Sequence, residues 1–212
     1  MEKIDMAKKD TAKIDVEPAT ELTDSDIADL CDAAETAILD GGGFGWLKPP
    51  PRARLERYWR GVLLVPEREL VVGRLDGRIV GSAQLVLSPR NNEAQARIAT
   101  ITSHFVAPWA RGLGIARSMT DACERAARRN GVQFINLDVR ETQEAAIQLY
   151  EALGYERWGT NPNYAVVDGH VIAGHYYTKR LGRRVRRAAS QKVDTRVSGD
   201  PNSQNVKDGK TS

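Results

Sequence analysis

The chain has 212 residues, which is enough for one well-packed domain with additional segments. Its formal net charge of +3 is too small to indicate nucleic-acid binding, and its apolar runs, such as Ala83–Leu87, are too short to cross a membrane. Residues 1–15 contain no apolar block, so we expect no secretion signal, a cytoplasmic location, and reduced, buried thiols at Cys31 and Cys123.

The N-terminal half alternates strand and helix patterns around a loop rich in glycine and proline. Residues 1–11 are charged and lack apolar periodicity, so we expect a disordered arm there. The elements that follow are expected, in chain order, as a strand at Lys13–Val16, a helix capped by Thr23 or Asp24, the loop Gly41–Pro51, a helix at Arg52–Val65, and strands at Glu69–Arg74 and Arg78–Leu87 around an Asp76-Gly77 hairpin turn.

The C-terminal half predicts a strand–helix–strand crossover followed by antiparallel strands. Its elements are expected, in chain order, as a strand at Ala94–Val106, a helix from a glycine-rich turn to about Arg129, a strand at Phe134–Val139, a helix at Glu144–Leu153, and closing strands at Tyr155–Trp158 and Val171–Arg180. A turn is expected at Asn161–Asn163 between the closing strands, and Asp168-Gly169 precedes the second of them. Residues 182–212 are polar and basic without core-forming periodicity, which predicts a disordered tail. We therefore expect the folded domain to span residues 12–181.

The glycine-rich turn after Val106 is the most informative part of the chain. A strand that ends in such a turn and leads into a helix leaves backbone N–H groups unpaired, and these groups bind anions such as phosphate. No Lys follows Gly114, which excludes a Walker loop, and Arg117 stands where a dinucleotide fingerprint needs its third glycine. What remains is Arg-x-x-Gly-x-Ala at Arg111–Ala116.

This motif resembles the pyrophosphate-binding motif of the GNAT superfamily of acyl-CoA N-acyltransferases, Gln/Arg-x-x-Gly-x-Gly/Ala. A second segment, Ala146–Tyr155, is similar to the A-x-x-L-Y-x-x-x-G-F/Y signature of the same superfamily. The resemblance covers about residues 14–181 and implies a single α/β domain. Its central sheet would be mixed but mostly antiparallel, with flanking helices and two splayed strands that end at Val106 and Val139.

The resemblance also implies acetyl-CoA as cosubstrate, held in the gap between the splayed strands, with no metal. Val106 would pair with the pantetheine arm and polarise the thioester carbonyl through its main chain. Gln143, where many relatives carry Asn, would contact the pantetheine. The backbone N–H groups expected to cradle the pyrophosphate belong to Arg111, Gly112, Leu113, Gly114, Ile115, Ala116 and Arg117.

Acetyl transfer to an amine also needs a proton donor for the leaving thiolate and an acceptor for the amine proton. Tyr150 stands where the family's general acid stands. Many relatives use a Glu on the first splayed strand as base, but counting back from Val106 by two places His104, Thr102 and Thr100 on one face, without a carboxylate. The identity of the general base is therefore open. His104 is either the base or a partly buried His that makes one hydrogen bond. The weaker candidates for the base are Glu93, Asp138 and His175.

The acceptor site of such an enzyme would be built from the Gly/Pro loop and the last hairpin. The aromatic and polar residues expected there are Phe44, Trp46, Tyr164 and His175. They suit a small polar amine, and the layout is loosely similar to acetyltransferases of the tabtoxin-resistance type. We therefore expect transfer of an acetyl group to a primary amine of a small molecule by direct attack in a ternary complex.

Two other functions stay open at this point. One is a protein acetyltransferase that modifies lysine or an N-terminus, and the other is a non-catalytic acyl-CoA-binding module. We expect neither a nucleic acid nor a membrane as partner, and a homodimer is compatible with the sequence.

Overall fold

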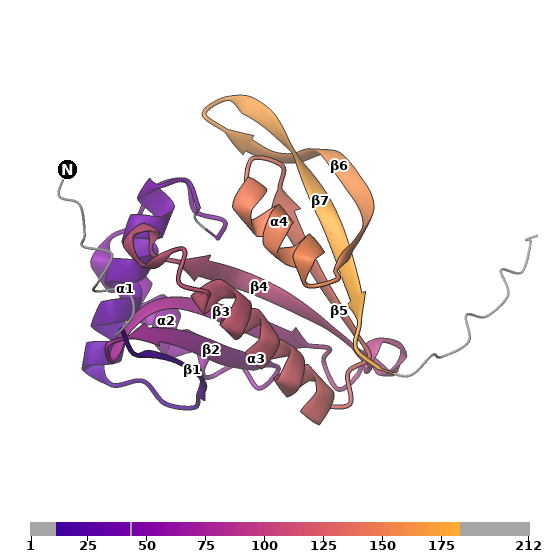
Figure 1. The fold of residues 1–212 in the computed structure, drawn as a ribbon, viewed down its shortest axis with the longest axis horizontal. Coiled ribbons are helices and arrows are strands. Elements are labelled where there is room, and N and C mark those ends of the chain that lie inside the picture. The colour runs from indigo at the N-terminus through magenta and orange to yellow at the C-terminus, as the bar shows by residue number, and fades with distance from the viewer. Residues whose placement is uncertain (1–11, 43, 183–212) are drawn as a thin grey trace, which may run out of the picture. The chain divides into compact units, whose positions relative to one another are not determined.

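A seven-stranded sheet in the order β1-β2-β3-β4-β5-β7-β6 is the centre of the fold (Figure 1). Neighbouring strands are antiparallel except β4 and β5, which are parallel. The computed structural model describes residues 12–42 and 44–182. The expected arm at residues 1–11 and nearly all of the expected tail at 182–212 thus lie outside the described residues.

The described elements follow the chain from strand to helix and back in the expected alternation. Their bounds are β1 Ile14–Ala19, α1 Asp24–Leu39, α2 Arg52–Val62, β2 Arg68–Leu75, β3 Arg78–Leu87, β4 Ile98–Val106, α3 Ile115–Arg129, β5 Phe134–Arg140, α4 Glu144–Ala152, β6 Glu156–Val167 and β7 His170–Arg180, with short 3₁₀ turns at Glu93–Gln95 and Pro108–Ala110.

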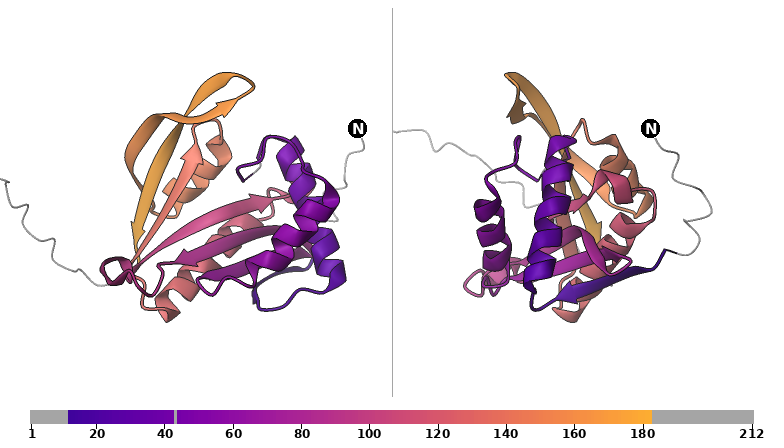
Figure 2. Two further views of the ribbon diagram at one scale, coloured as in Figure 1. Left: turned by 180° about the vertical axis from the view of Figure 1, so that it is seen from behind. Right: turned by 90° about the vertical axis from the view of Figure 1, so that its left-hand side faces the viewer.

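Helices cover both faces of the sheet (Figure 2). On one face, α1 and α2 pack over the sheet around Leu30 and Trp59, which are fully buried. On the other face, α3 packs through Met119, Cys123 and its neighbours, and α4 adds to the same cluster. The expected fold class, a single α/β domain with a mixed but mostly antiparallel sheet and flanking helices, is confirmed.

Two sequence signals act as expected at the ends of elements. The Thr23 side chain accepts from the Asp26 backbone N–H at 3.1 Å while the Asp26 carboxylate accepts from the Thr23 backbone, a complete capping box that starts α1. Asp76 and Gly77 both have positive φ, at 51° and 85°, as a tight hairpin turn between β2 and β3 requires.

Three predicted boundaries are wrong. The helix expected to reach Val65 ends at Val62, because Pro66 disfavours helical backbone in the residue before it. The strand expected from Ala94 begins at Ile98, after the 3₁₀ turn. The turn expected at Asn161–Asn163 is an irregularity within the long strand β6, and the chain reverses at Asp168-Gly169, the pair expected before the last strand, where both residues have positive φ.

The expected splay is confirmed between β4 and β5. Their parallel pairing is confined to three positions, Ile98–Thr100 of β4 against Phe134–Asn136 of β5. Beyond that point the strands diverge, and Figure 1 shows β5 and β7 rising away from β4. Among the residues described, the β4 edge after Thr100 therefore has no strand partner on this side, and its backbone groups face the gap.

The two cysteines are buried and unpaired, as expected. Burial raises the pKa of the Cys31 thiol to about 11 and that of Cys123 to about 12, which leaves both protonated and poor nucleophiles. In the part of the chain that the structure describes, no helix has the length and apolar character needed to traverse a lipid bilayer.

Candidate active site

β4 carries a β-bulge beyond the point at which its pairing with β5 ends. Between Thr102 and Phe105 the register shifts, so that Ser103 and His104 oppose a single residue of β3. Ser103 takes a left-handed conformation (φ 50°), which is uncommon outside glycine, and its hydroxyl lies 3.2 Å from the Tyr58 hydroxyl. The contact to α2 thus holds the bulge in place.

The bulge changes which residues of β4 point to each face of the sheet, and this corrects the expectation that His104 and Thr102 share a face. Before it, Ile101 packs into the core beneath α3; after it, Phe105 packs on the opposite face, beneath α1 and α2. His104 and Thr102 therefore do not share a face, because a bulge adds one residue to the two-residue period on which that expectation depends. His104 faces α3 and α4, and Thr102 faces the other way.

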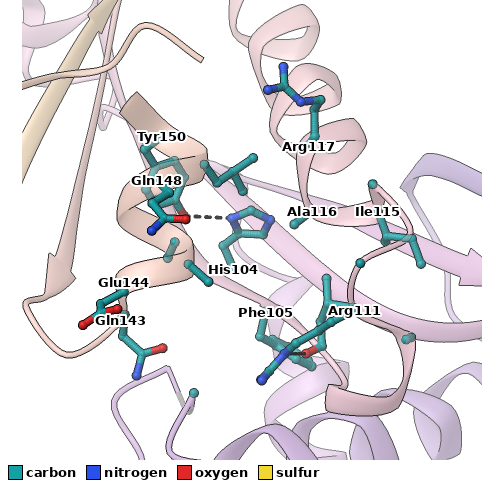
Figure 3. A pocket seen from close by; sticks show the side chains of 18 of the residues that line it. His104, Phe105, Arg111, Ile115, Ala116, Arg117, Gln143, Glu144, Gln148 and Tyr150 are labelled. Atoms are coloured by element: carbon teal, nitrogen blue, oxygen red, sulfur yellow. Dashed lines mark hydrogen bonds between the residues drawn. The ribbon is translucent and has the colours of Figure 1, made fainter. Parts of the chain in front are cut away.

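On the α4 side, His104 meets Tyr150. The Nδ1 atom of His104 lies 2.8 Å from the Tyr150 hydroxyl, and Figure 3 shows the two side chains pointing toward each other from β4 and α4. The imidazole ring of His104 lies between β4 and the start of α3. Its Nε2 atom lies near the backbone of Ala116 but makes no hydrogen bond of normal geometry there.

Burial sets the protonation state of both groups. It lowers the pKa of His104 from 6.5 to about 4, against a smaller opposing effect of the Ala116 backbone. It raises the pKa of Tyr150, with smaller contributions from Cys123 and Asp138. His104 as a whole residue is only partly buried, which moderates its shift, yet near neutral pH the pair is a neutral imidazole beside a protonated phenol.

The glycine-rich turn has the form expected of an anion cradle. Gly112 and Gly114 have φ of +77° and +79°, and a Cβ at either position would meet nothing within 4 Å. Gly114 is the N-cap of α3, and its carbonyl accepts from the Ser118 N–H at 3.0 Å. The backbone N–H groups before Ser118 therefore have no partner within the helix and point out of its N-terminal end. The space beside both glycines is open to a ligand.

Arg111 joins this turn to the end of α1. Its Nε donates to the Val106 carbonyl at 3.2 Å, and its Nη1 lies 2.5 Å from Oδ2 of Asp40. On the other side of the gap, Gln143 and Arg140 donate to the Gly41 carbonyl at 3.0 and 2.9 Å. The residues after α1 therefore contact both the turn that follows β4 and the end of β5, a role that the sequence patterns did not indicate.

A cavity of about 780 Å³, here called the turn cavity, lies between the glycine turn and α4. Every residue predicted for acetyl-CoA binding lines it except Leu113, which packs against the core. His104 and Tyr150 line its inner end. The diphosphate of acetyl-CoA fits the open space at the two left-handed glycines and the unpaired N–H groups of the helix. The amide-rich arm of acetyl-CoA fits the free edge of β4.

A second cavity of about 530 Å³, here called the hairpin cavity, lies between the loop after α1, β4, β5 and the end of β6. Phe44 and Tyr164 line it, as expected of acceptor residues. Trp46 and His175 do not line either cavity. Trp46 instead packs beside Tyr58 and Arg54, and His175 is hydrogen-bonded to Thr160 at 3.0 Å.

The two cavities meet at the splay. The residues that line both are Gly42, His104, Gln143, Ala146 and Tyr150. A molecule in one cavity could therefore reach a molecule in the other at the His104–Tyr150 pair. Within the described ranges, no group of three or more His, Cys, Asp or Glu side chains is placed to hold a metal ion.

Comparison with known proteins agrees with this arrangement. The acetyltransferase (GNAT) family model matches residues 31–155. An uncharacterised N-acetyltransferase from the hisH–hisA intergenic region of Azospirillum brasilense is 61% identical over 130 residues, which cover 61% of this chain and 77% of that protein. A mycothiol acetyltransferase of Paenarthrobacter aurescens is 31% identical over 99 residues, covering 47% of this chain but only 30% of its own length.

Among solved structures, the putative acetyltransferase YncA of Salmonella typhimurium, determined with its cofactor acetyl-CoA, has a similar fold. The TM-score is 0.67 at 16% identity, and the match covers 83% of this chain and 98% of that one. The family match and the high identity to a named N-acetyltransferase confirm the enzyme class and the acetyl-CoA cosubstrate expected from the sequence. The chain belongs to the acetyltransferase (GNAT) family.

Proposed function

We propose that this enzyme transfers the acetyl group of acetyl-CoA to a primary amine of a small molecule, by direct attack in a ternary complex. The observation that supports this most strongly is the meeting of two cavities at one proton-donating pair, His104 and Tyr150. Two substrates that approach from different sides need no covalent enzyme intermediate. We place the catalytic domain at residues 12–181.

In this proposal the turn cavity holds acetyl-CoA, which supplies the acetyl group as an activated thioester. The backbone N–H groups of Arg111–Arg117 bind its diphosphate, aided by the positive end of the α3 dipole. The main chain of Val106, on the unpaired edge of β4, binds the arm and polarises the carbonyl. Gln143 lies across the gap and contacts the same arm.

Tyr150 acts as the general acid. Its raised pKa keeps the proton on the hydroxyl near neutral pH, and because the departing thiolate is a weaker base than a phenolate, the transfer depends on stabilisation of the phenolate. His104 is a positioning residue: with Nδ1 protonated, it donates to the Tyr150 oxygen and stabilises the phenolate that remains. This tautomer leaves Nε2 as an unprotonated nitrogen, in keeping with its lack of a normal hydrogen bond.

The hairpin cavity takes the acceptor in this scheme. Its volume of about 530 Å³ lies within the range of small-molecule sites. Phe44 from the loop after α1 and Tyr164 from β6 form opposite parts of its lining, which limits an acceptor to compact shapes. For Trp46 and His175, the predicted role in acceptor binding remains a prediction from the sequence alone.

The test is a thiol-release assay with acetyl-CoA against small amines, basic peptides and peptide N-termini. We expect turnover with small amines, and Tyr150→Phe to lower kcat ~100-fold. Because the substitution removes one buried hydroxyl, it should change the Kd for acetyl-CoA by less than about threefold. Turnover with peptides alone would favour a protein acetyltransferase, and acetyl-CoA binding without any turnover would favour the non-catalytic module.

A further inference from the structure

The side chains of β5 alternate between the hydrophobic core and the opposite face of the sheet. Ile135, Leu137 and Val139 pack into the core beneath α3 and α4. Because side chains alternate along a strand, Asp138 points to the opposite face, and it lines the hairpin cavity as an exposed residue. Its carboxylate is therefore open to whatever that cavity binds.

Asp138 is the sole acidic residue in the described lining of the hairpin cavity. The cationic residue of the lining, Arg140, directs its guanidinium to the Gly41 carbonyl at 2.9 Å. Much of the remaining wall is apolar, contributed by Phe44, Leu47 and the β6 segment 165–167. A cavity with one carboxylate and apolar walls favours a small cation that carries an apolar substituent.

Tyr164 holds the carboxylate in place. A Cβ at Gly174 would overlap the Tyr164 ring, so the bare backbone of β7 lets this ring lie flat against the strand. In that position the Tyr164 hydroxyl donates to Oδ2 of Asp138. Burial raises the pKa of Tyr164, and the bond to Asp138 raises it further, so the phenol remains a donor to the carboxylate.

Asp138 also shares a cavity with the proposed reacting pair. Its negative charge contributes to the raised pKa of Tyr150, behind burial and Cys123. Asp138, His104 and Tyr150 line the same cavity. The carboxylate thus opens onto the cavity that the acceptor would occupy, which His104 and Tyr150 also line.

Resting on the proposed function, we infer that Asp138 binds the ammonium group of the acceptor and takes its proton. The ammonium transfers one proton to an Asp138 oxygen, from which it passes to solvent. The nitrogen lone pair then forms the new C–N bond as the C–S bond breaks. The second nitrogen proton replaces the one that Tyr150 gives to the sulfur, so that one proton is released for each acetyl group transferred.

The experiment compares two acceptors of equal shape. The first is the best primary amine from the panel, and the second is its aminooxy analogue, in which oxygen replaces the carbon next to nitrogen. The amine is a cation near neutral pH, whereas the aminooxy nitrogen is already neutral and needs neither ammonium binding nor removal of the ammonium proton that Asp138 takes. The proteins are wild type, Asp138→Asn and, as matched control, Glu156→Gln on the exposed part of β6.

We expect Asp138→Asn to lower kcat/KM for the amine ~100-fold and that for the aminooxy analogue less than about threefold. Glu156→Gln should leave both values unchanged, and acetyl-CoA should bind all three proteins equally. An equal loss for both acceptors, or no loss for the amine, would overturn the assignment while leaving the proposed function intact. Wild-type protein that binds acetyl-CoA but acetylates no amine would overturn the proposed function itself.

Discussion

His104 and Tyr150 show how burial prepares a proton donor. Each side chain alone would be an ordinary titrating group, but in the interior the charged form of either one is disfavoured. Their 2.8 Å contact gives the phenol a partner that can stabilise its charge only after the proton has left. This makes the pair inert at rest and reactive when a thiolate is produced beside it.

The shifted pKa of His104 predicts a pH dependence of stability. The unfolded chain binds a proton at this residue near pH 6.5, but the folded chain binds it only near pH 4. Between these values the unfolded state binds more protons, so stability falls as pH falls through the window. Because His104 is only partly buried, solvent screening reduces the effect, and we expect a loss of about 1 to 2 kcal/mol.

Urea unfolding of wild type and His104→Asn across this pH window measures the effect. Carboxylates titrate in both proteins, so the difference between them isolates His104. Wild type should lose the additional stability and the variant should not. Parallel losses in the two proteins would show that the ring is not protected from protonation.

At the scale of elements, the bulge in β4 and the turn before α3 build the site. The bulge directs His104 toward α4, and the turn leaves helix N–H groups facing the same space. The turn was predictable because its glycines, Gly112 and Gly114, stand out in the sequence. The bulge was not, because the residues that form it are Ser103 and His104, and neither residue type indicates a left-handed conformation at that point.

The turn offers a test with an internal control. Gly114 and Gly131 lie at opposite ends of α3, with φ of +79° and +72° and open space around both. Alanine at either position should cost about 1 kcal/mol of stability. Only Gly114→Ala places a methyl group in the proposed diphosphate cradle, and it should weaken acetyl-CoA binding ~10-fold or more.

Calorimetric titration of the two variants distinguishes these effects, because strain present with and without ligand does not alter Kd. Gly131→Ala should bind acetyl-CoA as wild type does. Equal affinities for both variants would remove Gly114 from the binding site.

At the scale of the whole described domain, the divergence of β4 from β5 brings the chemistry together. It opens the sheet to substrates from two directions and places Tyr150 where they meet. The family, the fold class and the cosubstrate were predictable, since short motifs carry them. The hydrogen-bond partners of individual residues were less predictable. Asp138 and Tyr164 are 26 positions apart in the chain, and Asp40 and Arg111 are 71 positions apart, so no local sequence pattern predicts these pairs.

The acceptor site shows the same limit. Phe44 reaches its cavity because it stacks on Phe105 at 4.8 Å between ring centroids. Trp46, two residues later, turns toward α2 instead. Aromatic residues in a loop indicate a binding surface, but the packing of each ring decides whether it takes part.

The most direct measurement is a crystal structure of the enzyme with acetyl-CoA. The account predicts diphosphate oxygens within hydrogen-bond distance of backbone N–H groups between Arg111 and Arg117, with the sulfur beside the Tyr150 hydroxyl. A diphosphate bound away from this turn, or a sulfur on the far side of the sheet from Tyr150, would contradict it.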